Sequence, residues 1–130
     1  MQYSVAVRNA RQDAVETTIG TTPHLRVSTG GAPADCSAAD SGTLLVDITL
    51  PSDWMNAAAA GAKTKLGTWS GTAAASGTPG HWRLKESTNV TCHQQGTAGV
   101  ASGELSFDAA VAAIGQTVII NVFTVTDGNA

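Results

Sequence analysis

Charged side chains are scarce in this sequence. They make up 13% of its 130 residues, whereas soluble domains average about 25%. Alanine, glycine, threonine and serine take their place. Unpaired charges are costly at buried interfaces, so this composition favours a protein that covers much of its surface against copies of itself or against a larger body. A weakly charged, soluble monomer is the alternative interpretation.

The sequence also lacks the basic surplus that contact with nucleic acid requires. Seven Lys and Arg, scattered along the chain, stand against ten Asp and Glu, for a net charge of −3. No apolar run approaches the about 20 residues that span a bilayer. The N-terminal residues 1–8 lack the charged and apolar regions of a signal peptide. We therefore expect no nucleic acid or membrane as partner, and folding in a cytoplasm.

Cysteine is nearly absent as well, with only Cys36 and Cys92, far apart in the sequence. In a cytoplasmic product we expect both thiols to be reduced and buried. If the protein becomes part of an extracellular particle, the two cysteines could form a disulfide. The sequence leaves this question undecided, because spacing alone does not tell whether their Cα atoms approach each other.

The length and composition fit a single domain over residues 1–130. A domain of this size buries enough surface to fold without a disulfide or a structural metal. The sequence predicts one helix, over about residues 4–19. Ser4 is a suitable N-cap, and Gly20 can take the left-handed conformation that ends a helix. The stripe expected to pack on the core recurs at spacings of three and four. It comprises Val7, Ala10, Ala14, Val15 and Ile19.

From His24 the hydrophobic period changes to two, which indicates strands over about residues 24–126. Strands are predicted at 24–29, 43–50, 63–72, 81–87, 90–96, 103–108 and 116–126. Residues 52–61 suggest a short helical turn, and 109–114 are ambiguous between a helix and a loop. The last strand is apolar on both faces, which is typical of a central strand. We expect a mostly β fold, an antiparallel β-sandwich or jelly-roll-like domain with one N-terminal α-helix.

Catalytic, cofactor-binding and metal-binding patterns are not found. The cysteines and histidines, which would be the metal ligands, show neither C-x-x-C nor H-x-x-x-H spacing. Cys92 and His81 could face each other across a hairpin as nucleophile and base, but the sequence shows no third group that would orient them. Glu86 and Glu104 are conceivable neighbours, yet isolated surface acids explain them as well. We therefore predict a protein that is not an enzyme and carries no cofactor or metal.

The three tryptophans are the strongest candidates for binding. Indole rings stack on sugars and are enriched at interface centres. Trp82 shares a strand face with Leu84, so we expect it in the core. Trp54 and Trp69 are candidate interface residues or sugar platforms, and Trp69, flanked by small polar residues, is expected to be partly exposed. Two further interface candidates, Arg8 and Arg11, lie on the predicted helix.

Several strings along the chain resemble a known group of proteins. They are Arg8–Thr17, Ile19–Gly20, Thr29–Thr43, Leu50–Trp54, Gly77–Arg83, Thr91–Gly96 and Thr124–Ala130. They resemble strings of small virion structural proteins of tailed bacteriophages, and the resemblance extends over nearly the whole chain. The resemblance implies a place in the virion, after synthesis in the bacterial host cytoplasm, and it brings no catalytic residues.

We therefore expect a capsid decoration or cement protein, a dimer or trimer that binds the major capsid protein or other virion proteins. A tail or neck component is the second interpretation. A small carbohydrate-binding or receptor-binding module is the third, and an enzyme is the least favoured.

Overall fold

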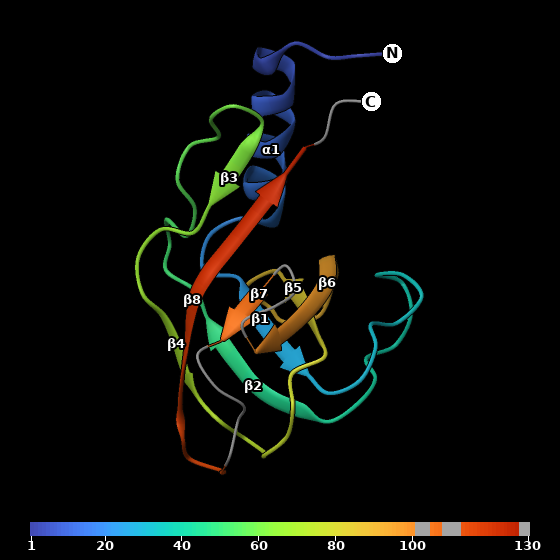
Figure 1. Cartoon of the computed structure of the whole chain (residues 1–130), viewed down its shortest axis with the longest axis vertical. Coiled ribbons are helices and arrows are strands. Elements are labelled where there is room, and N and C mark those ends of the chain that lie inside the picture. The colour runs from blue at the N-terminus through green and yellow to red at the C-terminus, as the bar shows by residue number, and fades with distance from the viewer. Residues whose placement is uncertain (101–104, 108–112, 128–130) are drawn as a thin grey trace.

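The computed structural model describes residues 1–100, 105–107 and 113–127. These residues form one helix and eight strands (Figure 1). They are α1 (Val5–Ile19), β1 (His24–Ser28), β2 (Leu44–Thr49), β3 (Ala62–Thr64), β4 (Trp69–Thr72), β5 (His81–Lys85), β6 (Cys92–Val100), β7 (Leu105–Phe107) and β8 (Thr117–Thr126). The predicted mostly β fold with one N-terminal helix is confirmed.

The strands follow one another in the order β2-β1-β5-β6-β7-β8-β3, and β4 also pairs with β8. All pairs are antiparallel except β6 with β7. The path folds over itself, so that Gly71 of β4 faces Val46 and Ile48 of β2. An added Cβ at Gly71 would lie 2.9 Å from Ile48 Cγ1. The result is a sandwich-like arrangement with a shared core.

Aromatic rings link the two layers. The Trp54 and Trp69 rings lie 6.2 Å apart, Trp69 is 5.2 Å from Phe123, and Phe123 meets Trp82 edge-on at 5.0 Å. Trp82 comes from β5 and Phe123 from β8. All four side chains are buried. The core position predicted for Trp82 is confirmed.

α1 begins and ends as predicted. The Ser4 hydroxyl accepts a hydrogen bond from the Val7 N–H, and Gly20 closes the helix with a positive φ of 88°. The predicted packing stripe, however, is largely wrong. Of its members only Ile19 is buried, whereas Val7, Ala10, Ala14 and Val15 are exposed.

Three other local predictions need correction. Residues 52–61 form no helical turn: bridges pair Met55 with Lys65 and Ala59 with Ala62, and Ala60 and Gly61, both with positive φ, make a tight turn between the last two. The single strand expected at 63–72 is two strands, separated around Gly67, whose φ is +77°. Of the ambiguous segment 109–114, residues 109–112 lie outside the described residues.

Simple alternation would place Val118, Ile120, Val122 and Thr124 on one face of β8, but the structure departs from this expectation. Pairing with β7 jumps from Val122 to Ile120, which inserts Asn121 as an extra residue. Such a bulge shifts the alternation by one. Val118, Ile120 and Phe123 are therefore buried, while Ile119 and Val122 are exposed. The central place predicted for the strand holds, since β8 pairs with β7, β3 and β4.

Candidate functional site

Neither tryptophan proposed for binding is accessible. Trp54 and Trp69 are 2% and 0% exposed, so the prediction of a partly exposed Trp69 is wrong. The Trp54 Nε1–H donates to the Gly20 carbonyl at 3.0 Å, and that of Trp69 donates to the Leu66 carbonyl at 3.1 Å. Both indoles are fully used inside the fold, and their rings offer no platform for a sugar.

Arg8 and Arg11 bind the opposite end of the described chain. Arg8 Nε donates to the Asp127 carbonyl at 2.8 Å, and Arg11 Nε lies 3.2 Å from an Asp127 carboxylate oxygen. The Arg8 guanidinium also contacts Gly61, where a side chain would collide with it. Arg11 is half-exposed and stacks 5.0 Å from the centre of the Tyr3 ring.

The side of α1 that faces the sheet is polar. Lys63 of β3, only 4% exposed, places its Nζ 2.6 Å from Asp13 and 2.7 Å from Glu16. Burial alone would lower the pKa of Lys63, but the hydrogen bonds to these two carboxylates outweigh it and raise the pKa. Asn9 and Asp13 further accept hydrogen bonds from the main-chain N–H groups of Gly61 and Ala58. Polar contacts therefore hold the helix in place.

Replacing Lys63 with Met is expected to loosen α1 and to lower the free energy of unfolding by about 2 kcal/mol, because it removes the buried cation of this cluster. Hydrogen exchange at the amides of residues 9–16 should accelerate more than exchange in β5. Lys65→Met is the matched control, since Lys65 Nζ donates to the exposed Gly67 carbonyl. Unchanged exchange in α1 of the Lys63 variant would contradict this account.

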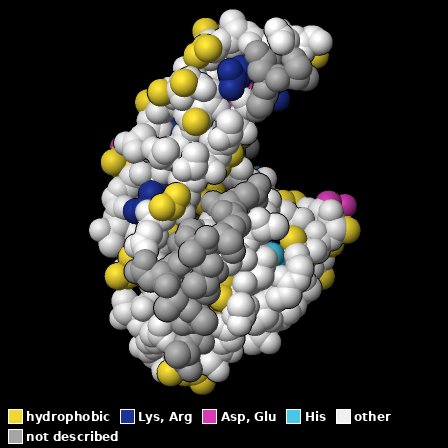
Figure 2. Space-filling view, in the orientation of Figure 1, with side chains coloured by type: hydrophobic (Ala, Val, Ile, Leu, Met, Phe, Trp, Pro, Cys, Tyr) yellow, Lys and Arg dark blue, Asp and Glu magenta, His cyan; other side chains and the backbone are white. Residues whose placement is uncertain are grey.

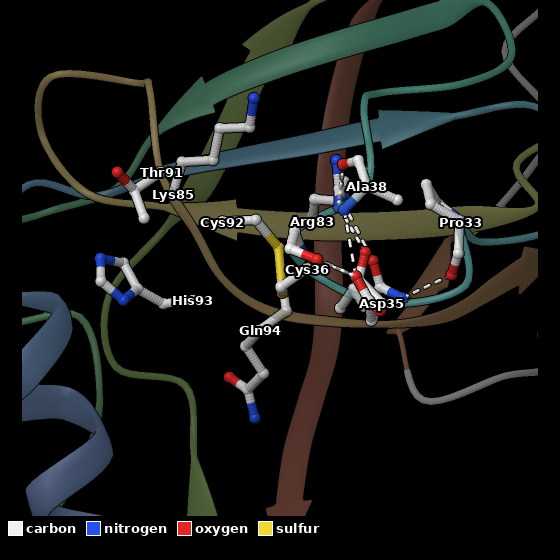
Figure 3. The surroundings of a disulfide bond; sticks show 12 residues. Pro33, Asp35, Cys36, Ala38, Arg83, Lys85, Thr91, Cys92, His93 and Gln94 are labelled. Atoms are coloured by element: carbon white, nitrogen blue, oxygen red, sulfur yellow. Dashed lines mark hydrogen bonds between the residues drawn. A yellow bond between two sulfur atoms is a disulfide. The ribbon is translucent and has the colours of Figure 1, made fainter.

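The cysteines form a disulfide, with Cα atoms 5.1 Å apart (Figure 3). The prediction of reduced thiols is therefore wrong. The loop before β2 folds back over β5 and β6, where Arg83 donates to the carbonyls of Asp35 and Ala38, both at 2.9 Å. This docking carries Cys36 to the start of β6, where Cys92 lies. Cys92 is thus not available as a nucleophile.

Asp40 joins the two basic side chains under the same loop. Arg83 Nη1 lies 2.6 Å from one of its carboxylate oxygens, and Lys85 Nζ lies 2.8 Å from the other. Arg83 and Lys85 are both buried. Hydrogen bonding from Lys85 lowers the pKa of Asp40, burial opposes this, and Arg83 adds to the lowering. The cluster is a structural clamp whose charges are already paired.

The conceivable Cys92–His81 pair is not assembled. His81 pairs with Thr97 at one end of the β5–β6 hairpin, whereas Cys92 pairs with Lys85 at the other. His81 Nδ1 instead lies 3.0 Å from the Gly30 carbonyl. Hydrogen bonds from the Thr88 hydroxyl and the Thr91 N–H lower the pKa of Glu86 to about 2. Its conceivable neighbour Glu104 lies outside the described residues.

A slot between β6 and β8 is the most unusual polar feature. It has a volume of about 250 Å³ and is lined by Trp82, Gln94, Gln95, Thr124, Val125 and Thr126. The Trp82 Nε1–H is buried without a hydrogen-bond partner. A second hollow shares Gln94, Val125 and Thr126 and extends to α1. Figure 2 shows the molecule hollowed at the right, below the helix. No pattern in the sequence predicted this slot.

Within the described part of the chain, no three His, Cys, Asp or Glu side chains gather as metal ligands. No helix there is long and apolar enough to cross a membrane. Comparisons with known proteins found no matching family model, no matching curated protein and no matching solved structure. What the chain does is therefore inferred from its own residues.

Proposed function

We propose that this chain is a non-enzymatic structural protein of a tailed-bacteriophage particle, and that it decorates the assembled capsid shell. The resemblance along the sequence supports the assignment to a virion. The observation that carries the decorating role is the orientation of α1. The helix turns its polar residues inward and leaves its apolar stripe outside.

This orientation is the reverse of an ordinary surface helix, which buries its apolar stripe. Val7 and Val15 are 43% and 38% exposed, and Ala10 and Ala14 between them are exposed too. Figure 2 shows hydrophobic side chains over the upper part of the molecule, which α1 and the loop before β3 form. Small and branched side chains on one helix face allow close packing against another subunit.

The remaining surface suits the same role. The loop before β2 is fixed by the disulfide, and the charges beneath it are paired. The tryptophans are buried, so the body is well braced and few reactive side chains are accessible. A rigid body that binds only the assembled shell stabilises that shell by mass action. The paired state of Cys92 and the enclosed position of His81 support a protein that is not an enzyme.

Cryo-electron microscopy of the particle tests the proposal. Density for this chain in hundreds of copies over the shell is the expected result. The copy number relative to the major capsid protein, measured on a quantitative gel, should agree with that density. Density only at the tail or neck would overturn the decorating role and favour a tail or neck component.

Ala14→Glu is expected to weaken binding of the purified chain to undecorated shells at least ten-fold, because it places a charge on the outward face of α1. The free energy of unfolding should change by less than about 0.5 kcal/mol, as at most exposed sites. Ser87→Glu, in an exposed turn, is the matched control and should bind normally. Equal binding by both variants would show that α1 does not face the shell.

A further inference from the structure

A hollow of about 420 Å³ opens beside the disulfide, and we call it the disulfide hollow. Cys36 and Cys92 both line it, and both residues are partly exposed. Its other walls are residues 37–40 of the loop, Arg83 and Lys85 of β5, and Val90 and Thr91 before β6. They lie at the start of β6, away from its end at Val100. The crosslink is therefore near the surface, at a place that a small molecule can enter (Figure 3).

The loop keeps its place through bonds that involve no sulfur atom. The carbonyls of Asp35 and Ala38, on either side of Cys36, both accept from the Arg83 guanidinium at 2.9 Å. Cys92 belongs to β6, which pairs with β5, the strand of Arg83. The two cysteines are thus held on neighbouring parts of the fold by other residues. In the reduced chain their thiols should stay adjacent, so the crosslink can be broken and remade without unfolding.

The charges of the hollow suit the exchange of sulfur bonds. Its charged side chains are Arg83, Lys85 and Asp40, so cations outnumber the carboxylate. Lys85 Nζ donates to Asp40 at 2.8 Å, and an ammonium group has three N–H donors in all. The attacking species in thiol–disulfide exchange is a thiolate. Neighbouring cations attract that thiolate and stabilise the cysteine thiolate that leaves.

We propose that the disulfide hollow is a site of thiol–disulfide exchange, in which a low-molecular-weight thiol or its disulfide reacts with the cysteine pair while the chain stays folded. The crosslink is then a modification added to a finished fold. It is not a requirement for reaching that fold.

The exchange balances in two steps. The thiolate of a small thiol attacks the sulfur of one cysteine, the S–S bond of the chain breaks, and a mixed disulfide forms. The other cysteine leaves as a thiolate and takes a proton from water. A second small thiolate then attacks the mixed disulfide and releases a small disulfide. The chain gains two electrons, which the two small thiols lose, and the reverse steps, starting from a small disulfide, oxidise the cysteines.

The site gives the chain a sequence of events. A cytoplasm keeps thiols reduced, and the chain folds there with its loop docked by Arg83. The crosslink forms when the folded chain meets a small disulfide outside the cell. Only this passage from one compartment to the other rests on the proposed function. The exchange itself is a property of the purified chain.

Reduction kinetics test whether the chain reacts in its folded state. The purified wild type is treated with 2-mercaptoethanol at rising urea concentrations below the unfolding transition, and the freed thiols are alkylated and counted by mass spectrometry. The rate should be proportional to the thiol concentration and nearly independent of urea. A reaction through the unfolded chain would instead accelerate with urea along the slope of global unfolding. Reoxidation of the reduced chain by oxidised glutathione should show the same indifference to urea.

A matched pair of variants tests whether the attack passes through the hollow. Thr91 lines it and is exposed, so Thr91→Glu and Thr91→Gln should both fold normally. The added carboxylate repels an incoming thiolate. At low salt, Thr91→Glu should therefore be reduced about three- to ten-fold more slowly than Thr91→Gln, and the difference should shrink at high salt. Ser87→Glu, in the same turn but outside the lining, should change the rate less than two-fold.

Two results would overturn the proposal. A reduction rate that rises with urea along a substantial part of the unfolding slope would mean that the crosslink reacts only after the chain opens. Equal rates for Thr91→Glu and Thr91→Gln at low salt would place the attack outside the disulfide hollow. Neither result bears on where the chain lies in a particle, which particle density tests separately.

Discussion

Asp40→Asn is expected to lower the free energy of unfolding by about 3 kcal/mol, the low end for breaking a buried ion pair, because Asp40 itself is partly exposed. The cost arises from Arg83 and Lys85, which stay buried and would lose the carboxylate that both of them contact. Asp53→Asn is the matched control, since Asp53 is exposed, and it should change stability by less than about 0.5 kcal/mol. Urea unfolding at neutral pH measures both.

The same residue gives the result a pH dependence. The pKa of Asp40 is lower in the folded chain than in the unfolded one. Its contribution is therefore complete above the unfolded value of about 3.9 and is lost as the pH falls through the folded value. The stability difference between the wild type and Asp40→Asn should shrink as the pH is lowered below about 4. A difference that stays constant, or one under about 1 kcal/mol at neutral pH, would contradict the proposed clamp.

Removal of the disulfide is the second large effect. Cys36 and Cys92 are 56 residues apart, and a crosslink of that span stabilises a fold by about 2–4 kcal/mol, mainly by restricting the unfolded chain. The double variant Cys36→Ala, Cys92→Ala should lose this amount in urea unfolding. Dithiothreitol should reduce the stability of the wild type to nearly the same value.

The double variant also serves as the control for dithiothreitol. Because it has no disulfide, the reductant should leave the stability of this variant unchanged. The hydrogen bonds from Arg83 to the carbonyls of Asp35 and Ala38 do not involve the sulfur atoms, so they should persist without the disulfide. The loop should therefore keep its place, and hydrogen exchange at Ala38, whose N–H is bonded to Asp35, should rise only modestly. Equal stability of oxidised and reduced wild type would show that the crosslink does not restrict the chain.

Local patterns predicted most of the fold. The cap at Ser4, the stop at Gly20 and the strands at residues 24–29, 43–50, 81–87 and 116–126 depend on neighbours in sequence, and the structure confirms them. β5 shows where such patterns fail. Alternation places Arg83 and Lys85 on the face opposite Trp82 and Leu84, and a charged face is ordinarily solvent-exposed, yet all five residues of the strand are buried. The loop that covers Arg83 and Lys85 comes from residues before β2, so the alternation of residues within β5 gives no sign of it.

The candidate site was predictable only in part, for the same reason. Trp69 is flanked by small polar residues, which suggested exposure, but it packs on Phe123, 54 positions later (5.2 Å between rings). The proximity of Cys36 to Cys92 depends on the loop that Arg83 holds. Each is set by tertiary packing, which spacing in a single sequence does not encode.

Arg8 donates to the Asp127 carbonyl across a separation of 119 residues. A ribosome adds about 5–20 residues per second, so the helix emerges many seconds before its anchoring point exists. The side of α1 that waits for that anchor carries Arg8, Asn9, Gln12, Asp13 and Glu16. These side chains are well solvated, and a nascent chain that displays them does not attract non-native hydrophobic contacts there. The contact of Arg8 with Asp127 accordingly forms among the last events of synthesis, after the partners of Asn9, Asp13 and Glu16 at residues 58–63 have been made. A truncated nascent chain should lack this last anchor.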